Sequence, residues 1–218
     1  MPLAIDLFCG LGGWTEGLLA EGWDVIGFDI EQHVYGEHRY PAQLVIQDVL
    51  TLHGSQFKTA DLIVASPPCQ EYSYMAMPWK LAKAKAAAIR ADTTGAELER
   101  LNRLFNTCFR IQQEASAAAG RHVPMVVENV RGAIPWVGAS SWHGGSFHLW
   151  GDVPVLMPDL NPRKGFAGFK RFKKDFHNYE ASRRWSSRDP RRKQWSAMIA
   201  KIPLALSVHI ARVYKPTA

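Results

Sequence analysis

A short apolar run, LAIDLF at 3–8, ends directly at a glycine-rich turn, CGLGG at 9–13, and a helical segment follows at once. Further runs that end at turns or polar residues recur along the chain, at 24–28, 44–49, 61–66 and 124–130. Runs that are apolar throughout, rather than at every second residue, are typical of parallel strands covered on both faces. The chain therefore predicts an α/β fold with a largely parallel sheet.

The order of these segments suggests three regions. Helices are expected at 14–20, 79–91 and 96–120, between the apolar runs. Residues 1–135 are expected to form a Rossmann-like core. Residues 136–194 are expected to form a small, irregular region rich in basic and aromatic residues. Residues 195–218 are expected to form a C-terminal helix, interrupted by Pro203, that packs back on the core.

Most of the positive charge lies in one segment of the second region. The whole chain has a formal charge of +6, but residues 163–193 contain twelve Lys or Arg and three Asp or Glu, a net charge of +9. A run of charge is usually an ordinary solvated face. Here aromatic residues such as Phe166, Tyr179 and Trp185 are interleaved with the cations, and aromatic rings can stack on bases. We therefore favour a nucleic-acid partner over a solvated face.

Several classes of protein do not fit the sequence. The N-terminus lacks the basic and apolar regions of a secretory signal, and no apolar run has the ~18 residues of a membrane span. The three cysteines are widely spaced and odd in number, which indicates a reducing compartment without disulfides or a zinc site. We expect a cytoplasmic protein with no membrane partner and no metal.

The glycine-rich turn is a candidate cofactor site. In an open α/β sheet, the turn after the first strand is where an adenosine-type cofactor is held, and glycine lets a ligand approach the backbone. Asp29 ends the second run, 19 residues after Gly10, where an acid can accept hydrogen bonds from both ribose hydroxyls. Asp48 ends the third run and could accept a bond from an adenine amino group. Because the spacing differs from G-x-G-x-x-G, a nucleoside fits better than a dinucleotide.

Cys69 is a candidate nucleophile. It follows Pro67 and Pro68, which stiffen the loop after the fourth apolar run and cannot donate to a strand ladder. A free cysteine is generally a small buried hydrophobe, and we accept that interpretation for Cys108 within an apolar helical stripe. Cys9, in the glycine-rich turn, is also expected to be structural. The rigid loop favours a nucleophilic role for Cys69 alone.

Glu128 is a candidate acid. It directly follows the apolar run that ends in MVV, so we expect its carboxyl group to be partly desolvated, which favours the protonated form. A neutral carboxylic acid can donate a proton or a hydrogen bond near neutral pH. Taken alone, Glu128 would more simply be an acid in solvent at the end of a strand.

Together these features resemble the cytosine-C5 DNA methyltransferase family. The matching motifs occur in the family's order over about three-fifths of the chain and are DLFCGLGG at 6–13, FDIE at 28–31, QDV at 47–49, SPPCQ at 66–70 and ENV at 128–130. The segment 200–214 loosely resembles the family's last motif, a helix that completes the cofactor pocket. The short second region resembles the compact enzymes of bacteriophages and prophages, some of which belong to restriction–modification systems.

The resemblance implies a DNA (cytosine-5-)-methyltransferase with the methyltransferase variant of the Rossmann-like fold. It implies S-adenosylmethionine as cofactor and double-stranded DNA as partner, and we expect a monomer. In the family's reaction the Cys69 thiolate attacks C6 of a flipped-out cytosine while Glu128 contacts N3 and the exocyclic amine. Carbon 5 then takes the methyl group, and loss of its proton with release of Cys69 restores the ring.

The resemblance also assigns residues to the two binding sites. The expected cofactor-binding residues are Phe8, Gly10, Leu11, Gly12, Gly13, Asp29, Ile30, Asp48, Val49 and Pro67. The expected DNA-binding residues are Gln70, Ser73 and Arg131, together with Lys170, Arg171, Lys173 and Lys174 of the basic segment. The residues from 136 to 194 would then recognise the target.

One family motif is missing. The family has Gln-x-Arg-x-Arg after its glutamate motif, whereas this chain has GGSFHLWGDVP at 144–154, without arginine. Arg131 and Arg163 are candidates to replace it. Two other interpretations stay open: methylation of cytosine in RNA, since one branch of the family acts on transfer RNA, and a DNA-binding protein that kept the fold without turnover.

Overall fold

The central element of this computed structural model, which describes residues 1–73, 78–160 and 189–217, is a sheet of seven strands. The spatial order is β5-β2-β1-β6-β7-β9-β8. The first five of these pair in parallel, whereas β9 is antiparallel to both β7 and β8. The strands are β1 Leu3–Leu7, β2 Asp24–Asp29, β5 Gln43–Ile46, β6 Leu62–Ala65, β7 Met125–Asn129, β8 Trp142–Gly144 and β9 Phe147–Gly151. The expected α/β, Rossmann-like fold with a largely parallel sheet is confirmed.

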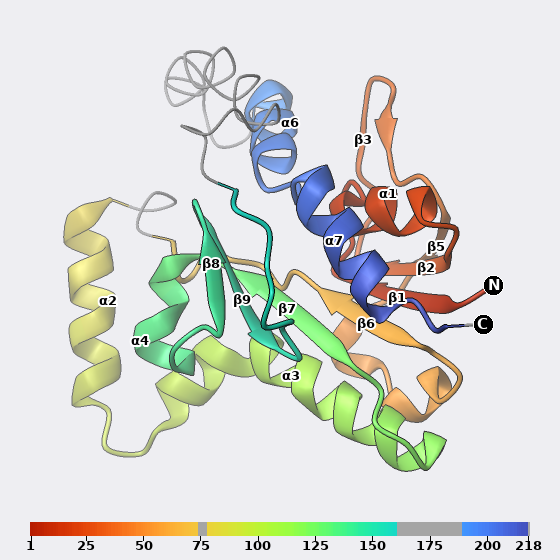
Figure 1. Cartoon of the computed structure of the whole chain (residues 1–218). Coiled ribbons are helices and arrows are strands. Elements are labelled where there is room, and N and C mark those ends of the chain that lie inside the picture. Colours follow the sequence, from red (N-terminus) through yellow and green to blue (C-terminus); the bar gives the residue numbers. More distant parts are fainter. Residues whose placement is uncertain (74–77, 161–188, 218) are drawn as a thin grey trace.

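Helices cover both faces of this sheet (Figure 1). On one face lie α1 (Gly13–Ala20) and α7 (Leu204–Tyr214), and on the other lies the long α3 (Ala96–Ala119). The smaller elements surround this frame: the hairpin β3 Val34–Tyr35 and β4 His38–Arg39, the helices α2 Trp79–Ala91, α4 Ile134–Val137 and α6 Pro190–Ile199, and the 3-10 turns Val49–Thr51, Gly54–Phe57 and Arg131–Ala133.

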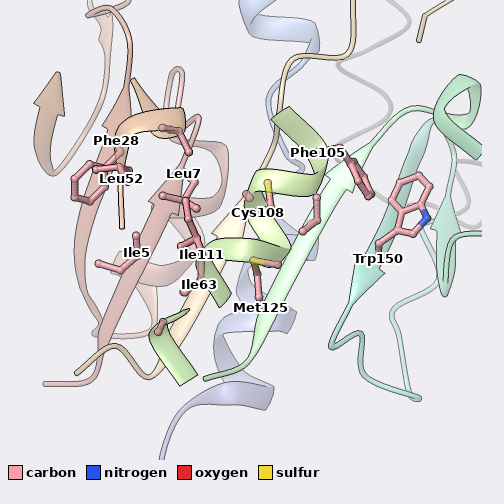
Figure 2. Packing of buried hydrophobic residues seen from close by; sticks show 14 of the residues in the cluster. Ile5, Leu7, Phe28, Leu52, Ile63, Phe105, Cys108, Ile111, Met125 and Trp150 are labelled. Atoms are coloured by element: carbon pink, nitrogen blue, oxygen red, sulfur yellow. The ribbon is translucent and has the colours of Figure 1, made fainter. Parts of the chain in front are cut away.

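Two apolar clusters form, one on each side of the sheet. Figure 2 shows the cluster beneath α3, where Phe105, Cys108 and Ile111 pack against strand residues such as Ile5 and Ile63. Cys108 has no exposed surface there, in agreement with its interpretation as a small hydrophobe. The second cluster joins side chains of α1 and α7 to the opposite face. Burial on both faces explains why the strands read as continuous apolar runs.

The C-terminal helix α7 is held tightly against α1. A Cβ atom at Gly17 would lie 2.1 Å from the Ser207 Oγ atom, so only glycine permits this approach. The Ser207 hydroxyl donates a 2.5 Å hydrogen bond to the Trp14 carbonyl oxygen, and the Trp23 indole donates one of 3.2 Å to that of Ala211. The C-terminal segment thus packs on the helix that follows the glycine-rich turn.

The structure differs from the sequence prediction in two places. The sheet extends past residue 135, because β8 and β9 form a hairpin whose turn contains Gly145 at φ 62° and whose second strand pairs with β7. The C-terminal helical segment begins at Pro190 rather than at 195, and the expected interruption at Pro203 divides it into α6 and α7. Within the described ranges no single helix is long and apolar enough to cross a membrane, although the bent pair Arg191–Ile199 and Leu204–Tyr214 passes that test by length and composition.

Candidate active site

A cavity of about 620 Å³ lies where β1, β2, β6 and β7 end, at the carboxyl edge of the sheet. The strand order reverses between β1 and β6, and ligands of open α/β sheets bind outside such a reversal. The cavity is lined by twelve of the predicted residues, namely Phe8, Gly10, Leu11, Gly13, Asp29, Ile30, Asp48, Val49, Pro67, Cys69, Gln70 and Glu128. Gly12, Ser73 and Arg131 are not part of this lining. Lys170, Arg171, Lys173 and Lys174 lie outside the described residues.

The glycine-rich turn bends sharply under this cavity. Gly10 has φ 50°, and Phe8 has φ 57°, a left-handed conformation that costs a side-chain-bearing residue about 1–2 kcal/mol. A Cβ atom built at Gly10 would meet no atom within 4 Å, so the space beside this residue is open. Gly12 instead allows close packing of the turn against Pro41, since a Cβ atom there would lie 2.5 Å from the Pro41 Cδ atom.

Asp29 closes one side of the turn. The Gly10 backbone N–H donates a 2.9 Å hydrogen bond to Asp29 Oδ2, and the His33 Nε2 atom lies 3.6 Å from Oδ1. Burial opposes ionisation of Asp29, but the interactions with His33 and Gly10 outweigh it and hold its pKa below the ordinary value. Asp48 is fixed on the cavity wall by the Leu50 N–H, which donates a 2.9 Å bond to Oδ1. Both carboxylates therefore stand ready to accept hydrogen bonds from a ligand.

Asp6 is a cavity residue that the sequence prediction missed. Its side chain is only 1 % exposed, and its Oδ2 atom accepts a 2.6 Å hydrogen bond from the Thr15 hydroxyl. Its other oxygen, Oδ1, is buried without a hydrogen-bond partner. Burial raises the pKa of Asp6 to about 8. An acid within the apolar run LAIDLF was the available signal, because a buried carboxyl group needs a compensating partner.

The Cys69 loop is held by three hydrogen bonds. Asn129 Nδ2 donates a 2.9 Å hydrogen bond to the Pro67 carbonyl oxygen. The Cys69 carbonyl oxygen accepts bonds from the N–H groups of Tyr72 and Ser73, at 3.0 and 2.8 Å, which turn the chain back after the cysteine. Burial, followed by the charge of Glu128, raises the pKa of the Cys69 thiol to about 11. The free protein therefore holds a protonated thiol at neutral pH.

Glu128 faces the same cavity from the end of β7. Its side chain is buried, and burial raises its pKa to about 8, although its interaction with Ser66 works in the opposite direction. The Ser66 hydroxyl is itself held by a 3.0 Å hydrogen bond from the Trp14 indole. At neutral pH Glu128 is thus mainly a neutral acid, the form that can donate a hydrogen bond.

Helix α6 completes the cavity in a way that the sequence did not signal. It contributes Arg192, Lys193, Ser196 and Ala197, and the segment after it contributes Ala200, Lys201 and Ile202. Arg192 is the single arginine in the lining formed by the described residues.

The place of the missing arginine motif is taken by β9. His148 of this strand is paired with Asn129 of β7, and its Nδ1 atom lies 3.0 Å from the Ser140 hydroxyl. Arg131 begins the 3-10 turn after β7 and is exposed outside the cavity. Arg163 lies outside the described residues.

No group of three or more His, Cys, Asp or Glu side chains suited to a metal ion occurs in the part of the chain that the structure describes.

The doubly wound sheet and the cavity at its carboxyl edge define a Rossmann-like methyltransferase fold. The model of the family described as C-5 cytosine-specific DNA methylase matches residues 3–133, which is more than half of the chain. The chain belongs to the C-5 cytosine-specific DNA methylase family.

Solved structures show more distant similarity. A prophage-encoded DNA modification methyltransferase (E. coli) is 25% identical, with a TM-score of 0.40 over 62% of this chain and 33% of that chain. The Entamoeba histolytica methyltransferase EhMeth is 16% identical, with a TM-score of 0.40 over 63% and 40%. The S. pombe Dnmt2 methyltransferase is 15% identical, with a TM-score of 0.38 over 62% and 36%. The match thus covers at most two-fifths of these proteins, and no curated protein matches the chain.

Proposed function

We propose that this protein is a DNA (cytosine-5-)-methyltransferase that uses S-adenosylmethionine and a covalent bond between Cys69 and cytosine C6. The observation that carries the proposal is that Cys69, Glu128 and the Gly10–Asp29 turn line one cavity. Membership of the C-5 cytosine-specific DNA methylase family supports the same reaction. A nucleophile, an acid and a nucleoside site in one cavity are the three parts that this chemistry needs.

The cavity fits the proposed cofactor on three counts. Asp29 is an ionised acceptor for ribose hydroxyls beside the open space at Gly10. Asp48 is an acceptor for an adenine amino group. The unpartnered Oδ1 atom of Asp6 is suited to a positively charged group, which would compensate its burial. When bound, S-adenosylmethionine supplies a methyl group activated by a sulfonium centre.

The residues around the target base then have separate roles in the reaction. Neutral Glu128 donates a hydrogen bond to cytosine N3, which draws electrons from C6 and stabilises the charge that develops. While Glu128 is neutral, it does not repel a thiolate at Cys69, whose pKa its charge would otherwise raise further. The thiolate forms a bond to C6, C5 accepts the methyl group, and loss of the C5 proton breaks the bond between sulfur and C6.

The target base must leave the helix to reach this cavity, because a stacked base cannot offer C5 and C6 to both groups. We propose double-stranded DNA as the substrate and assign contacts to Gln70, Ser73 and Arg131. Lys170, Arg171, Lys173 and Lys174 would add contacts from the target-recognition region at 136–194. The enzyme is proposed to act as a monomer of the compact type found in phages, within DNA modification.

Transfer of tritiated methyl groups tests the proposal. The protein is incubated with labelled S-adenosylmethionine and either duplex DNA or transfer RNA, and the recovered nucleosides are separated. We expect label in 5-methylcytosine from DNA. Label in RNA alone would contradict the substrate assignment, and label in neither polymer despite DNA binding would favour a protein without turnover.

A further inference from the structure

Helix α2, Trp79–Ala91, has an unusual charge pattern that the proposed reaction does not use. Its thirteen residues include Lys80, Lys83, Lys85 and Arg90 and no acid. Surface helices ordinarily mix both signs of charge, which form pairs along the helix. Lys80, Lys83 and Arg90 are exposed, and among the described residues none of the three has an acidic partner within salt-bridge distance.

The inner side of α2 is a narrow apolar stripe. Only Ala82 and Ile89 are buried, and they face Tyr72, Leu101 and Trp136. The first turn is far more open, since Trp79 is 60% exposed and Leu81 57%. The helix therefore rests on the body by a small contact and presents Lys80 and Lys83 outward, whereas Lys85 pairs with Glu71 and the Arg90 guanidinium lies 5.4 Å from the centre of the Trp136 ring.

An aromatic ring and a cation lie together in the first turn. The Lys83 ammonium group lies 5.0 Å from the centre of the Trp79 ring. A partly exposed tryptophan beside cations is typical of surfaces that bind nucleic acid, where the cation meets phosphate and the ring packs on the sugar or base.

Helix α2 is also tied to the nucleophile loop. Glu71, two residues after Cys69, forms ion pairs with Lys85 of α2 at 2.5 Å and with Arg100 of α3 at 3.4 Å. The Tyr72 hydroxyl has one proton to donate and lies 3.1 Å from the Leu101 carbonyl oxygen and 3.0 Å from Asn102 Oδ1. Helix α2 stands on one side of the carboxyl edge of the sheet, and α6, with its own cations, stands on the other (Figure 1).

We infer that the outer face of α2 is a second contact surface for the DNA backbone, in which Lys80 and Lys83 bind phosphates on the side of the target cytosine opposite α6. This inference rests on the proposed function for its choice of DNA. The Glu71–Lys85 ion pair links this contact to the loop of Cys69, so phosphate binding holds the loop beside the base.

The salt dependence of binding to a fluorescent duplex of mixed sequence tests this surface. Glutamine has nearly the helix propensity of lysine, so Lys80→Gln/Lys83→Gln removes two charges without a cost to the helix. The slope of log K against log salt is negative, and each lost phosphate contact reduces its magnitude by about 0.9. We expect the magnitude of the slope to fall by about 2 in this variant. Binding of S-adenosylmethionine, measured by calorimetry, should stay unchanged.

Lys58→Gln is the matched control, because Lys58 is exposed and precedes β6, at the amino edge of the sheet. It should leave the slope unchanged. A wild-type slope in the double variant would overturn the inference and leave the proposed function intact. Wild-type protein that binds no duplex would overturn both. Preferential loss of transfer RNA binding would instead assign the face to RNA and contradict a DNA surface.

Discussion

The side-chain amide of Asn129 donates a 2.9 Å hydrogen bond to the backbone carbonyl oxygen of Pro67. Asn129 directly follows Glu128 on β7, and Pro67 precedes Cys69 by two residues. This buried bond therefore joins the strand that carries the acid to the loop that carries the nucleophile. Its loss would leave a buried carbonyl group unpaired, which costs about 1–3 kcal/mol.

Asn129→Ala should lower kcat by about 10–100-fold, because the loop no longer holds Cys69 in place. The free energy of unfolding should fall by about 1–3 kcal/mol. Gln112→Ala is the matched control, since it removes bonds to Val123 and Asp152 away from the site. Methyl transfer and chemical denaturation are measured for both variants. Equal losses of kcat would show that Asn129 acts only through stability.

The reactivity of Cys69 should depend on Glu128. Above a pH of about 8 Glu128 is ionised, and its charge then opposes formation of the thiolate, whose pKa is raised to about 11. Glu128→Gln removes that charge, so alkylation of Cys69 by iodoacetamide should reach its midpoint at a lower pH than in the wild type. Peptide mapping distinguishes Cys69 from the buried Cys9 and Cys108. An unchanged or higher midpoint would show that the two groups are not coupled.

Asp6 should favour cofactor binding at the expense of stability. Burial raises its pKa from 3.8 to about 8. The folded state therefore retains a proton that the unfolded chain loses, and the free energy of unfolding falls as pH rises between these values. Asp6→Asn cannot ionise, so it should be more stable than the wild type by about 1–3 kcal/mol above that range.

The same variant should bind S-adenosylmethionine at least about tenfold more weakly, because Asp6 can ionise beside a positively charged group and asparagine cannot. Denaturation at both ends of the pH range and calorimetry measure the two effects. Asp24→Asn, at an exposed acid, should change neither property. A less stable Asp6→Asn with normal affinity would contradict this role.

Cofactor affinity should rise with pH through the titration of His33. Its interaction with Asp29 raises the pKa of His33, while Glu31 and Tyr35 on the adjoining segment and Lys193 on α6 also face it. The protonated ring interacts with the Asp29 carboxylate and so competes with ribose hydroxyls for this acceptor. It also repels a positively charged ligand. Loss of the proton should therefore strengthen binding of S-adenosylmethionine.

His33→Ala should flatten this pH dependence in calorimetric titrations between a pH of about 6 and 8. His38→Ala, on the same hairpin but exposed, should retain it. A wild-type affinity that falls as pH rises would contradict the competition between His33 and ribose.

Local sequence patterns predicted the elements that position the site. Features that depend on contacts between distant segments were not predicted. The apolar runs and the motifs around Gly10, Cys69 and Glu128 lie on contiguous stretches, so their place at the sheet edge followed from the fold class. Asp6 and His33 carried weaker signals, an acid in an apolar run and a histidine four residues after Asp29. The position of Arg192 in the cavity lining and the pairing of β9 with β7 depend on segments distant in sequence, so no local periodicity predicts them.

The most direct test of the central claim is to trap the Cys69 adduct. Duplex DNA made with 5-fluorocytosine can accept the thiolate at C6 and the methyl group at C5, but fluorine cannot leave as the C5 proton does, so the bond between sulfur and C6 persists. With S-adenosylmethionine present, we predict that wild-type protein becomes covalently joined to this DNA and that peptide mapping places the bond at Cys69. Cys69→Ser should bind the cofactor normally and form no adduct. An adduct in Cys69→Ser, or methylated DNA from that variant, would contradict the account.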